Sequence, residues 1–281
     1  MKQRLRQQRA DMPHGADSPL GVAITGRDQA TLDMVTNAIQ HRQTMLAFQP
    51  VMQARAPKQT AFYEGLIRVL DPSGRVIPAR DFMPVVENTE LGREIDCIAL
   101  ETGLRTLMRN PSIRLSINMS ARSIGYNRWM RILNRLLKKD ASLGARLILE
   151  ITESSAMTVP ELVVDFMGRL QRHGIAFALD DFGAGFTAFR YFRDFYFDAV
   201  KIDGQFVRGI YNNPDNQVLT QALIAIARQF DMLTVAESVE TRKDAEYLMS
   251  IGIDCLQGYL FGAPTIRPPW IPDKQQSKQV A

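Results

Sequence analysis

The sequence predicts an α/β protein built as a (β/α)8 barrel of the TIM type, and three observations lead to this fold class. The chain has 281 residues, enough for one barrel-sized domain. Short apolar, β-favouring runs alternate with longer helix-like segments along most of the chain. Nearly every apolar run carries an acidic or amide residue inside it or just after it. Because alternation alone does not show closure, a doubly wound open sheet is the alternative architecture.

The individual elements follow from the apolar pattern and from Pro and Gly signals. Helix-like stretches occupy, for example, residues 93–109, 160–174 and 213–230. Pro160 suits a first helical turn and Gly174 suits the end of the same helix. The expected strands are residues 45–51, 61–69, 114–120, 145–154, 175–182, 198–203, 233–239 and 254–261.

Composition divides the chain into three parts. Residues 1–30 are polar and broken by Pro and Gly, so we expect a flexible or peripheral lead-in. Residues 31–268 form the expected barrel, and residues 269–281 form a polar tail after a Pro-rich stretch. The chain shows neither a long apolar segment that would cross a membrane nor the apolar core of a secretory signal.

Charge and cysteine content narrow the function classes. Lys plus Arg minus Asp plus Glu is 34 − 30 = +4, spread along the chain without a Lys/Arg run. The sequence therefore predicts neither a DNA nor an RNA partner. Cys97 and Cys255 form no CxxC pattern, which argues against a disulfide framework and a zinc site and fits a reducing cytoplasm.

The polar residues at the strand ends predict a metal site. Side chains alternate along a strand, so Glu64 shares one face with Leu66 and Arg68 while Gly65 lies on the other. The carboxyl ends of barrel strands meet at one mouth, where clustered carboxylates require a cation. An all-oxygen ligand set favours Mg²⁺ or Mn²⁺ and is large enough for two ions. The expected ligands are Glu64, Asn118, Glu150, Asp180, Asp181 and Glu237.

Each of these residues has a structural interpretation as well. A single Glu or Asp at a strand end is commonly a helix N-cap or a member of a loop salt bridge. Lys201 is either a paired lysine or, as a sharper alternative, an aldolase-type Schiff-base lysine. Glu153 falls on the opposite face from Glu150 and is expected to anchor a neighbouring loop.

Taken together, these residues stand in segments that resemble the EAL-domain family of cyclic-di-GMP phosphodiesterases. The resemblance covers residues from about Met45 to Pro264, with Gly65 where the family usually has Ala. It runs in order through FQPV (48–51), EGLIR (64–68), FMPVVE (82–87), INMS (117–120), LEITES (149–154), DDFGAGF (180–186), VKID (200–203), AESVE (236–240) and QGYLFGAP (257–264).

The resemblance implies a modified barrel whose first strand is antiparallel to the others, and it assigns roles to the residues. Glu64, Asn118, Glu150 and Asp180 would bind metal, with Asp181 and Glu237 completing a second ion site. Glu237 would also act as a general base, Lys201 would lie near the attacking water and Gln257 would help to place that water. Substrate contacts would fall on Gln49, Leu66, Arg68 and Asp203, and Glu153 would brace the loop at 180–187 through Thr187.

The implied activity is metal-dependent hydrolysis of cyclic-di-GMP to linear pGpG by a stand-alone domain that forms a homodimer. We expect Ca²⁺ to inhibit it. Besides Gly65, the departures from the family pattern are Ala184 for a frequent Thr, Phe186 for a usual Tyr and Ser238 for the usual Gly. The alternative is a weakly active or inactive cyclic-di-GMP receptor, or a protein-interaction module, on the same barrel.

Overall fold

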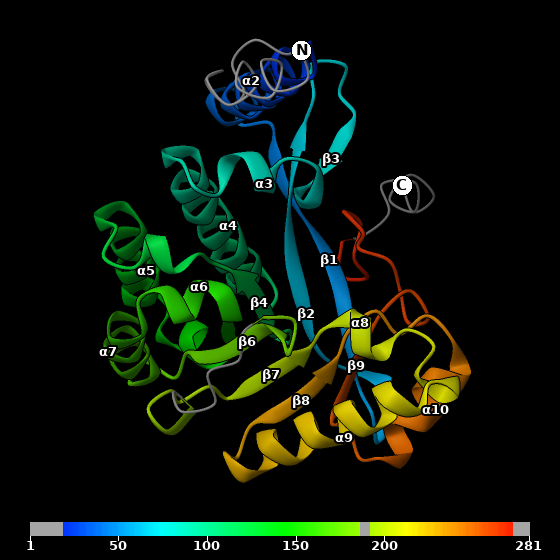
Figure 1. The fold of residues 1–281 in the computed structure, drawn as a ribbon. Helices are drawn as coiled ribbons and strands as arrows, with labels where there is room; N and C mark the ends of the chain where they lie inside the picture. Colours follow the sequence, from blue (N-terminus) through cyan, green and yellow to red (C-terminus); the bar gives the residue numbers. More distant parts are fainter. Residues whose placement is uncertain (1–18, 186–191, 272–281) are drawn as a thin grey trace, which may run out of the picture.

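A computed structural model describes residues 19–185 and 192–271, and their centre is a barrel of eight strands (Figure 1). A ninth, short strand, β3, extends the sheet outside the barrel. The strands are β1 (Thr44–Gln53), β2 (Ala56–Leu70), β3 (Val76–Pro78), β4 (Leu115–Asn118), β5 (Leu147–Thr152), β6 (Ala176–Phe182), β7 (Ala199–Ile202), β8 (Leu233–Ala236) and β9 (Cys255–Gln257).

The barrel closes through its first strand. Strand order is β1-β9-β8-β7-β6-β5-β4-β2-β3, and a further β1–β2 pairing completes the ring. β1 runs antiparallel to both β2 and β9, whereas every pairing from β2 through β4 to β9 is parallel. The predicted closed barrel with a reversed first strand is therefore confirmed, and an open doubly wound sheet is excluded.

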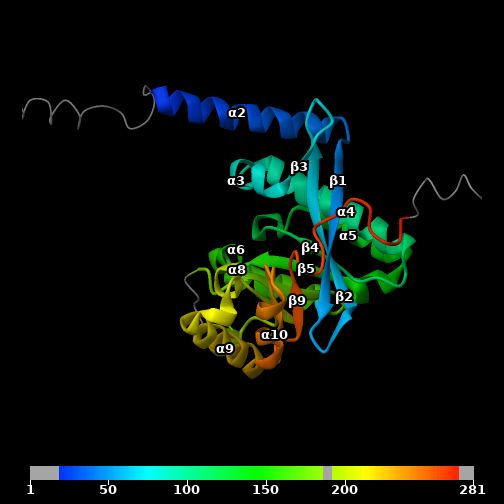
Figure 2. The ribbon, with the colours of Figure 1, turned by 90° about the vertical axis from the view of Figure 1, so that its right-hand side faces the viewer.

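Helices cover the outside of the barrel, while α2 lies apart from this layer above the β1–β2 hairpin (Figures 1 and 2). Among the described residues we find no helix with the length and apolar character needed to cross a bilayer. The helices are α2 (Pro19–Gln40), α3 (Met83–Val86), α4 (Glu90–Arg109), α5 (Asn127–Lys139), α6 (Glu153–Thr158), α7 (Pro160–Gln171), α8 (Gly204–Val207), α9 (Pro214–Gln229) and α10 (Arg242–Ser250).

Each expected strand overlaps an observed one. The expected limits of the barrel, residues 31 and 268, can be compared with the observed helix α2 and with the contacts of Trp270. α2 begins at Pro19 and so crosses the expected limit of the lead-in at residue 30. At the other end, the Trp270 ring lies beyond residue 268 but packs edge-on against Phe48 at 5.3 Å and Tyr63 at 4.5 Å between centroids. These contacts give the segment after Pro268 a place against β1 and β2.

Two glycines make room for one isoleucine between the barrel and α4. A Cβ atom on Gly65 would lie 2.7 Å from Ile117 Cδ1, and one on Gly103 would lie 2.8 Å from the same methyl group. Ile117 is 1% exposed, so it fills the space that the two glycines leave. Gly65 faces away from the cleft, as expected, but the space beside it is filled.

Gly65→Ala is therefore expected to destabilise the protein by about 1–3 kcal/mol, because the new methyl group overpacks the contact with Ile117. Ile117→Val removes the Cδ1 atom that the new Cβ would meet. The double variant should recover most of the loss in a denaturant titration. A loss in the double variant equal to the sum of the losses in Gly65→Ala and Ile117→Val would show that the two sites are independent.

Asp96 of α4 holds the turn that follows β4. Its Oδ2 atom accepts hydrogen bonds from the Ser120 backbone N–H (3.0 Å) and from Ser123 Oγ (2.6 Å). The carboxyl group is 6% exposed, and burial raises its pKa to about 7 despite both hydrogen bonds. This turn directly follows Asn118, so Asp96 supports the end of a strand that carries an expected metal ligand.

The raised pKa of Asp96 predicts a pH dependence of stability. Between its ordinary value near 4 and about 7, the folded protein retains a proton that the unfolded chain releases, so this group's contribution falls as pH rises through that window. Asp96→Asn keeps an acceptor oxygen but cannot ionise. Between pH 5 and pH 8, the melting temperature of the variant should fall less than that of the wild type. A constant difference in melting temperature between the variant and the wild type across this pH range would contradict the raised pKa of Asp96.

Candidate active site

The carboxyl ends of the barrel strands open into a cleft of about 800 Å³. The parallel strands bring their ends to this mouth because each is followed by a loop or a helix on the same side. Acidic side chains and Lys201 lie among the lining residues, and arginines and apolar side chains complete the wall. The lining is Gln49, Glu64, Leu66, Arg68, Pro78, Ala79, Arg80, Asp180, Lys201, Arg208, Glu237, Ser238, Glu240, Gln257, Gly258, Tyr259, Ala263 and Pro264.

Lys201 of β7 is the centre of the charge cluster. Its side chain is 1% exposed, and Nζ lies 2.7 Å from Glu237, 2.8 Å from Glu150, 3.1 Å from Asp180 and 3.4 Å from Glu64. Four carboxylates, three of them from β2, β5 and β6 and one from the segment after β8, thus converge on one ammonium group. This arrangement agrees with a paired lysine and leaves no unpaired amine for a Schiff base.

Two amide side chains fix the carboxylate of Glu64. Asn118 Nδ2 donates to Glu64 Oε1 at 2.8 Å, and Gln257 Nε2 donates to Glu64 Oε2 at 2.6 Å. Gln257 Nε2 also lies 3.2 Å from Gln49 Oε1. Both oxygens of Glu64 are therefore oriented by neighbours from β4 and β9, and the expected ligand and substrate residues form one connected network.

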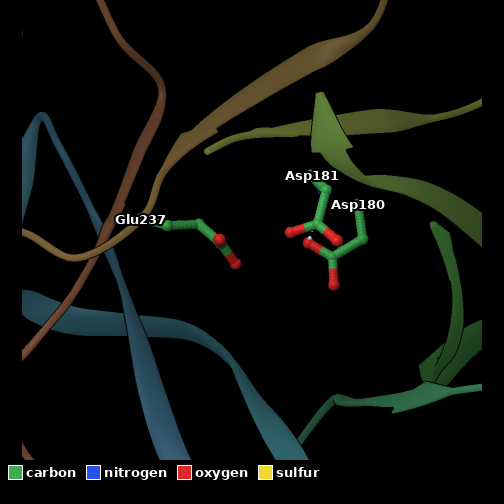
Figure 3. A group of neighbouring side chains, drawn as sticks. All are labelled: Asp180, Asp181 and Glu237. Carbon is green, nitrogen blue, oxygen red and sulfur yellow. Dashed lines mark hydrogen bonds between the residues drawn. The ribbon is translucent and has the colours of Figure 1, made fainter. Parts of the chain in front are cut away.

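Asp180, Asp181 and Glu237 make up a second part of the site (Figure 3). One carboxylate oxygen from each lies within 4.8 Å of the others. The two aspartates come from the end of β6, and Glu237 points toward them from the segment after β8. Asp181 has a positive φ of 57°, and this bend turns its side chain toward the same space as that of its neighbour.

The electrostatics of the cluster reflect a surplus of negative charge. Burial raises the pKa of Glu237 to about 8, and burial together with Asp180 raises the pKa of Asp181 to about 6. Burial and the neighbouring Glu64 likewise raise the pKa of Glu150. Burial opposes ionisation of Glu64, but Lys201 and the two amides hold its pKa below the usual value. Negative charge therefore exceeds positive charge in this cluster, and the pKa of three of its carboxyl groups is raised.

These residues fit a divalent metal ion. The donors are all oxygens, the class that Mg²⁺ and Mn²⁺ prefer. Among the described residues, Glu150 Oε1 is buried without a hydrogen-bond partner, so it has a free acceptor position. The surplus carboxylate charge is what a divalent ion would neutralise. The predicted ligands therefore lie together, although their metal binding stays a prediction.

Three of the four predicted substrate residues line the cleft. Gln49 and Leu66 lie on its wall, and Gln49 Nε2 also donates to Gly262 O at 3.1 Å. Arg68 lines the cleft while its Nη1 atom donates to a backbone carbonyl at 2.9 Å. Asp203 does not line it: its carboxylate caps α8 by accepting from the Gln205 backbone N–H at 2.7 Å. The expected contact between Asp203 and substrate stays a prediction.

Glu153 contacts the loop after β6, as its strand face predicts. It begins α6, is 1% exposed, and its Oε2 atom accepts from the Gly183 backbone N–H at 3.1 Å. Phe186 and Thr187 lie outside the described residues, so the expected contact between Glu153 and Thr187 stays a prediction.

The cleft is also lined by four charged or aromatic residues that the sequence analysis did not single out: Arg80, Arg208, Glu240 and Tyr259. Arg80, Arg208 and Glu240 lie outside the expected strands, and Tyr259 lies in the expected strand 254–261 but beyond Gln257, where the observed β9 ends, so strand parity carried no signal for them. Arg208 follows α8, only seven positions after Lys201, and this proximity is the one sequence feature that could have drawn attention to it.

Comparison with known proteins identifies the family of this chain. The model of the EAL domain family matches residues 32–264. The chain therefore belongs to the EAL domain family, in agreement with the ordered segments of its sequence.

The relatives extend this assignment. The chain is 32% identical over 239 residues to the cyclic di-GMP phosphodiesterase PdeF of Escherichia coli K12, covering 84% of this chain and 32% of that protein. It is 30% identical to the cyclic di-GMP phosphodiesterase PdeB of Shewanella oneidensis, covering 82% of this chain and 27% of that protein. The chain thus spans about a third of these relatives. A solved structure of the PaMucR phosphodiesterase in complex with c-di-GMP has a TM-score of 0.74 and 26% identity, covering 88% of this chain and 99% of that one.

Proposed function

We propose that this protein is a metal-dependent phosphodiesterase that hydrolyses one linkage of cyclic-di-GMP and yields linear pGpG. The observation that carries the proposal is the single cluster of carboxylates and amides around Lys201 at the barrel mouth. Similarity to cyclic-di-GMP phosphodiesterases at about 30% identity supports the substrate class. A homodimer is part of the same proposal, and light scattering would test it.

The roles of the residues follow from their positions. Glu64, Asn118, Glu150 and Asp180 would hold one ion, and Asp181 and Glu237 would help to hold a second. When bound, the metal would supply an activated water and neutralise charge on the phosphate oxygens.

The remaining residues orient the reactants. Glu237 would accept a proton from the attacking water, since its carboxylate lies beside Asp180 and 2.7 Å from Lys201. Lys201 would keep that carboxylate oriented, and Gln257, which already donates to Glu64, would help to place the water. Arg68 on the cleft wall would bind a phosphate oxygen through a charge-assisted hydrogen bond.

Incubation of the purified protein with cyclic-di-GMP and Mg²⁺ or Mn²⁺, followed by chromatography of the products, tests the proposal. We expect pGpG to form only with metal, and Glu64→Ala or Glu237→Ala to stop its formation. The alternative, a receptor or interaction module, predicts binding without turnover. All six proposed metal-binding side chains are present in this chain, which favours the enzyme.

Replacing Mg²⁺ with Ca²⁺ is expected to lower turnover at least about tenfold, because Ca²⁺ takes a larger and looser oxygen shell and acidifies bound water less. Substrate binding should persist, so equilibrium dialysis and product analysis would give opposite readings in Ca²⁺. Full turnover in Ca²⁺ alone would count against the proposed site.

A further inference from the structure

Ser238 has a backbone conformation that residues other than glycine seldom adopt. Its φ is +54°, in the left-handed region, immediately after Glu237 and on the wall of the cleft. A serine here carries a conformational cost that glycine would avoid. The contacts of its side chain indicate what this serine does.

The Ser238 side chain is held between a hydrogen-bond partner and a glycine. Its Oγ atom accepts a hydrogen bond from Arg208 Nη2 at 2.9 Å. A Cβ atom on Gly204 would lie 2.5 Å from Ser238 Oγ and 2.7 Å from Ser238 Cβ. Ser238 therefore occupies the space that Gly204 leaves, and the buried backbone of Gly204 restricts the directions that its hydroxyl can take.

The partner of this hydroxyl, Arg208, is a cleft residue without another close anchor among the described residues. Its Nε atom lies 3.8 Å from Glu240 Oε1, and both of these side chains are more than half exposed. An exposed ion pair at that distance fixes a guanidinium weakly. The hydrogen bond to Ser238 is thus the contact that sets where Arg208 stands on the wall.

We propose that Ser238 is a positioning residue that holds the Arg208 guanidinium ready to bind a pair of acceptor atoms on the substrate. Ser238 and Glu240 engage Nη2 and Nε, so the Nη1 hydrogens and the second hydrogen of Nη2 are free for a ligand. Two such donors on one edge match either two phosphodiester oxygens or the O6 and N7 atoms of guanine. This inference rests on the proposed function, because cyclic-di-GMP offers both groups.

A double-mutant cycle tests the proposal. Equilibrium binding of cyclic-di-GMP is measured with Ca²⁺ in place of Mg²⁺ so that turnover does not interfere. Arg208→Ala should raise Kd about tenfold or more, as expected for a charge-assisted contact. Ser238→Ala keeps the backbone and removes the hydroxyl, and it should raise Kd about threefold. In the Arg208→Ala background, Ser238→Ala should have no further effect.

Turnover in Mg²⁺ provides a second readout. Because Arg208 binds the ligand without reacting, KM should rise in both single variants while kcat stays within about threefold. Arg208→Lys keeps the charge but loses the fork of donors, so it should recover little of the affinity. Arg242→Ala, an exposed arginine two positions after Glu240 and not on the cleft wall, is the matched control and should leave Kd unchanged.

The outcomes separate this inference from the proposed function. If the wild type neither binds nor hydrolyses cyclic-di-GMP, the proposed function fails. If the wild type does both while Arg208→Ala binds equally well, only the role of Arg208 is overturned. Equal effects of Ser238→Ala with and without Arg208 would overturn the positioning role. Repeating the cycle at higher salt identifies the acceptor, since a phosphate contact weakens with salt more than a guanine contact does.

Discussion

Lys201→Met is expected to lower turnover of cyclic-di-GMP by about a thousandfold, within the range for removing a group that orients a general base. The same variant should destabilise the metal-free protein by about 3–5 kcal/mol, because four buried or partly buried carboxylates lose their shared cation. Chemical denaturation in EDTA measures the second effect. Mg²⁺ should then raise the melting temperature of the variant more than that of the wild type, since it would replace the missing charge.

Lys243→Met is the matched control for this variant. Lys243 is an exposed lysine whose Nζ lies 4.7 Å from the ring centroid of Tyr211, outside the cleft wall. Its replacement should change stability by less than about 1 kcal/mol and leave turnover intact. Loss of stability without loss of turnover in Lys201→Met would show that this lysine has a structural role alone.

Asp180→Asn is expected to reduce metal-dependent turnover by at least about a thousandfold. A proposed metal ligand would become a neutral amide, and the bound metal would then stabilise the transition state by several kcal/mol less. Asp180 lies at the junction of the site: it is 3.1 Å from Lys201 Nζ and clusters with Asp181 and Glu237. Calorimetric titration with Mn²⁺ should show weaker binding in the variant. Affinity for cyclic-di-GMP should fall much less than turnover.

Asp165→Asn controls for the loss of a carboxylate as such. Asp165 forms an exposed ion pair with Arg169 on α7, with 3.1 Å between Oδ2 and Nε. Turnover within threefold of the wild type is expected for this control, in line with the small energies of exposed ion pairs. If Asp180→Asn behaved in the same way, the proposed metal site would be wrong.

The barrel could be predicted because most of its strands, from β4 to β9, are short and consist mainly of buried residues. Each predicted strand overlaps an observed one, and strand parity correctly placed Glu64, Leu66 and Arg68 on the inside of the barrel. The reversed direction of β1 came from the family resemblance, since alternation of strands and helices does not record strand direction.

The cleft wall could be predicted only in part. Residues inside strands follow the two-residue period, but Arg80 lies in a one-turn 3-10 helix and Arg208 and Tyr259 lie on turns, where that period does not apply. Asp203 shares the strand period of Lys201 but stands at the start of a helix, where its Oδ1 atom accepts from the Gln205 backbone N–H. The fit of Ile117 against two glycines is likewise a three-dimensional feature, since the three residues are distant in sequence.

The reversed first strand also determines where the chain enters the barrel. Thr44 begins β1 and pairs with Val69 near the carboxyl end of β2, so α2 joins the barrel at the end that carries the cleft. In an all-parallel barrel, the segment before the first strand would enter at the opposite, stabilising face. β1 also carries Gln49, which contacts Gln257 and is thus linked to Glu64. A displacement of β1 at this end would reach the proposed metal ligand Glu64 directly, because Gln49 and Glu64 are also paired across the two strands.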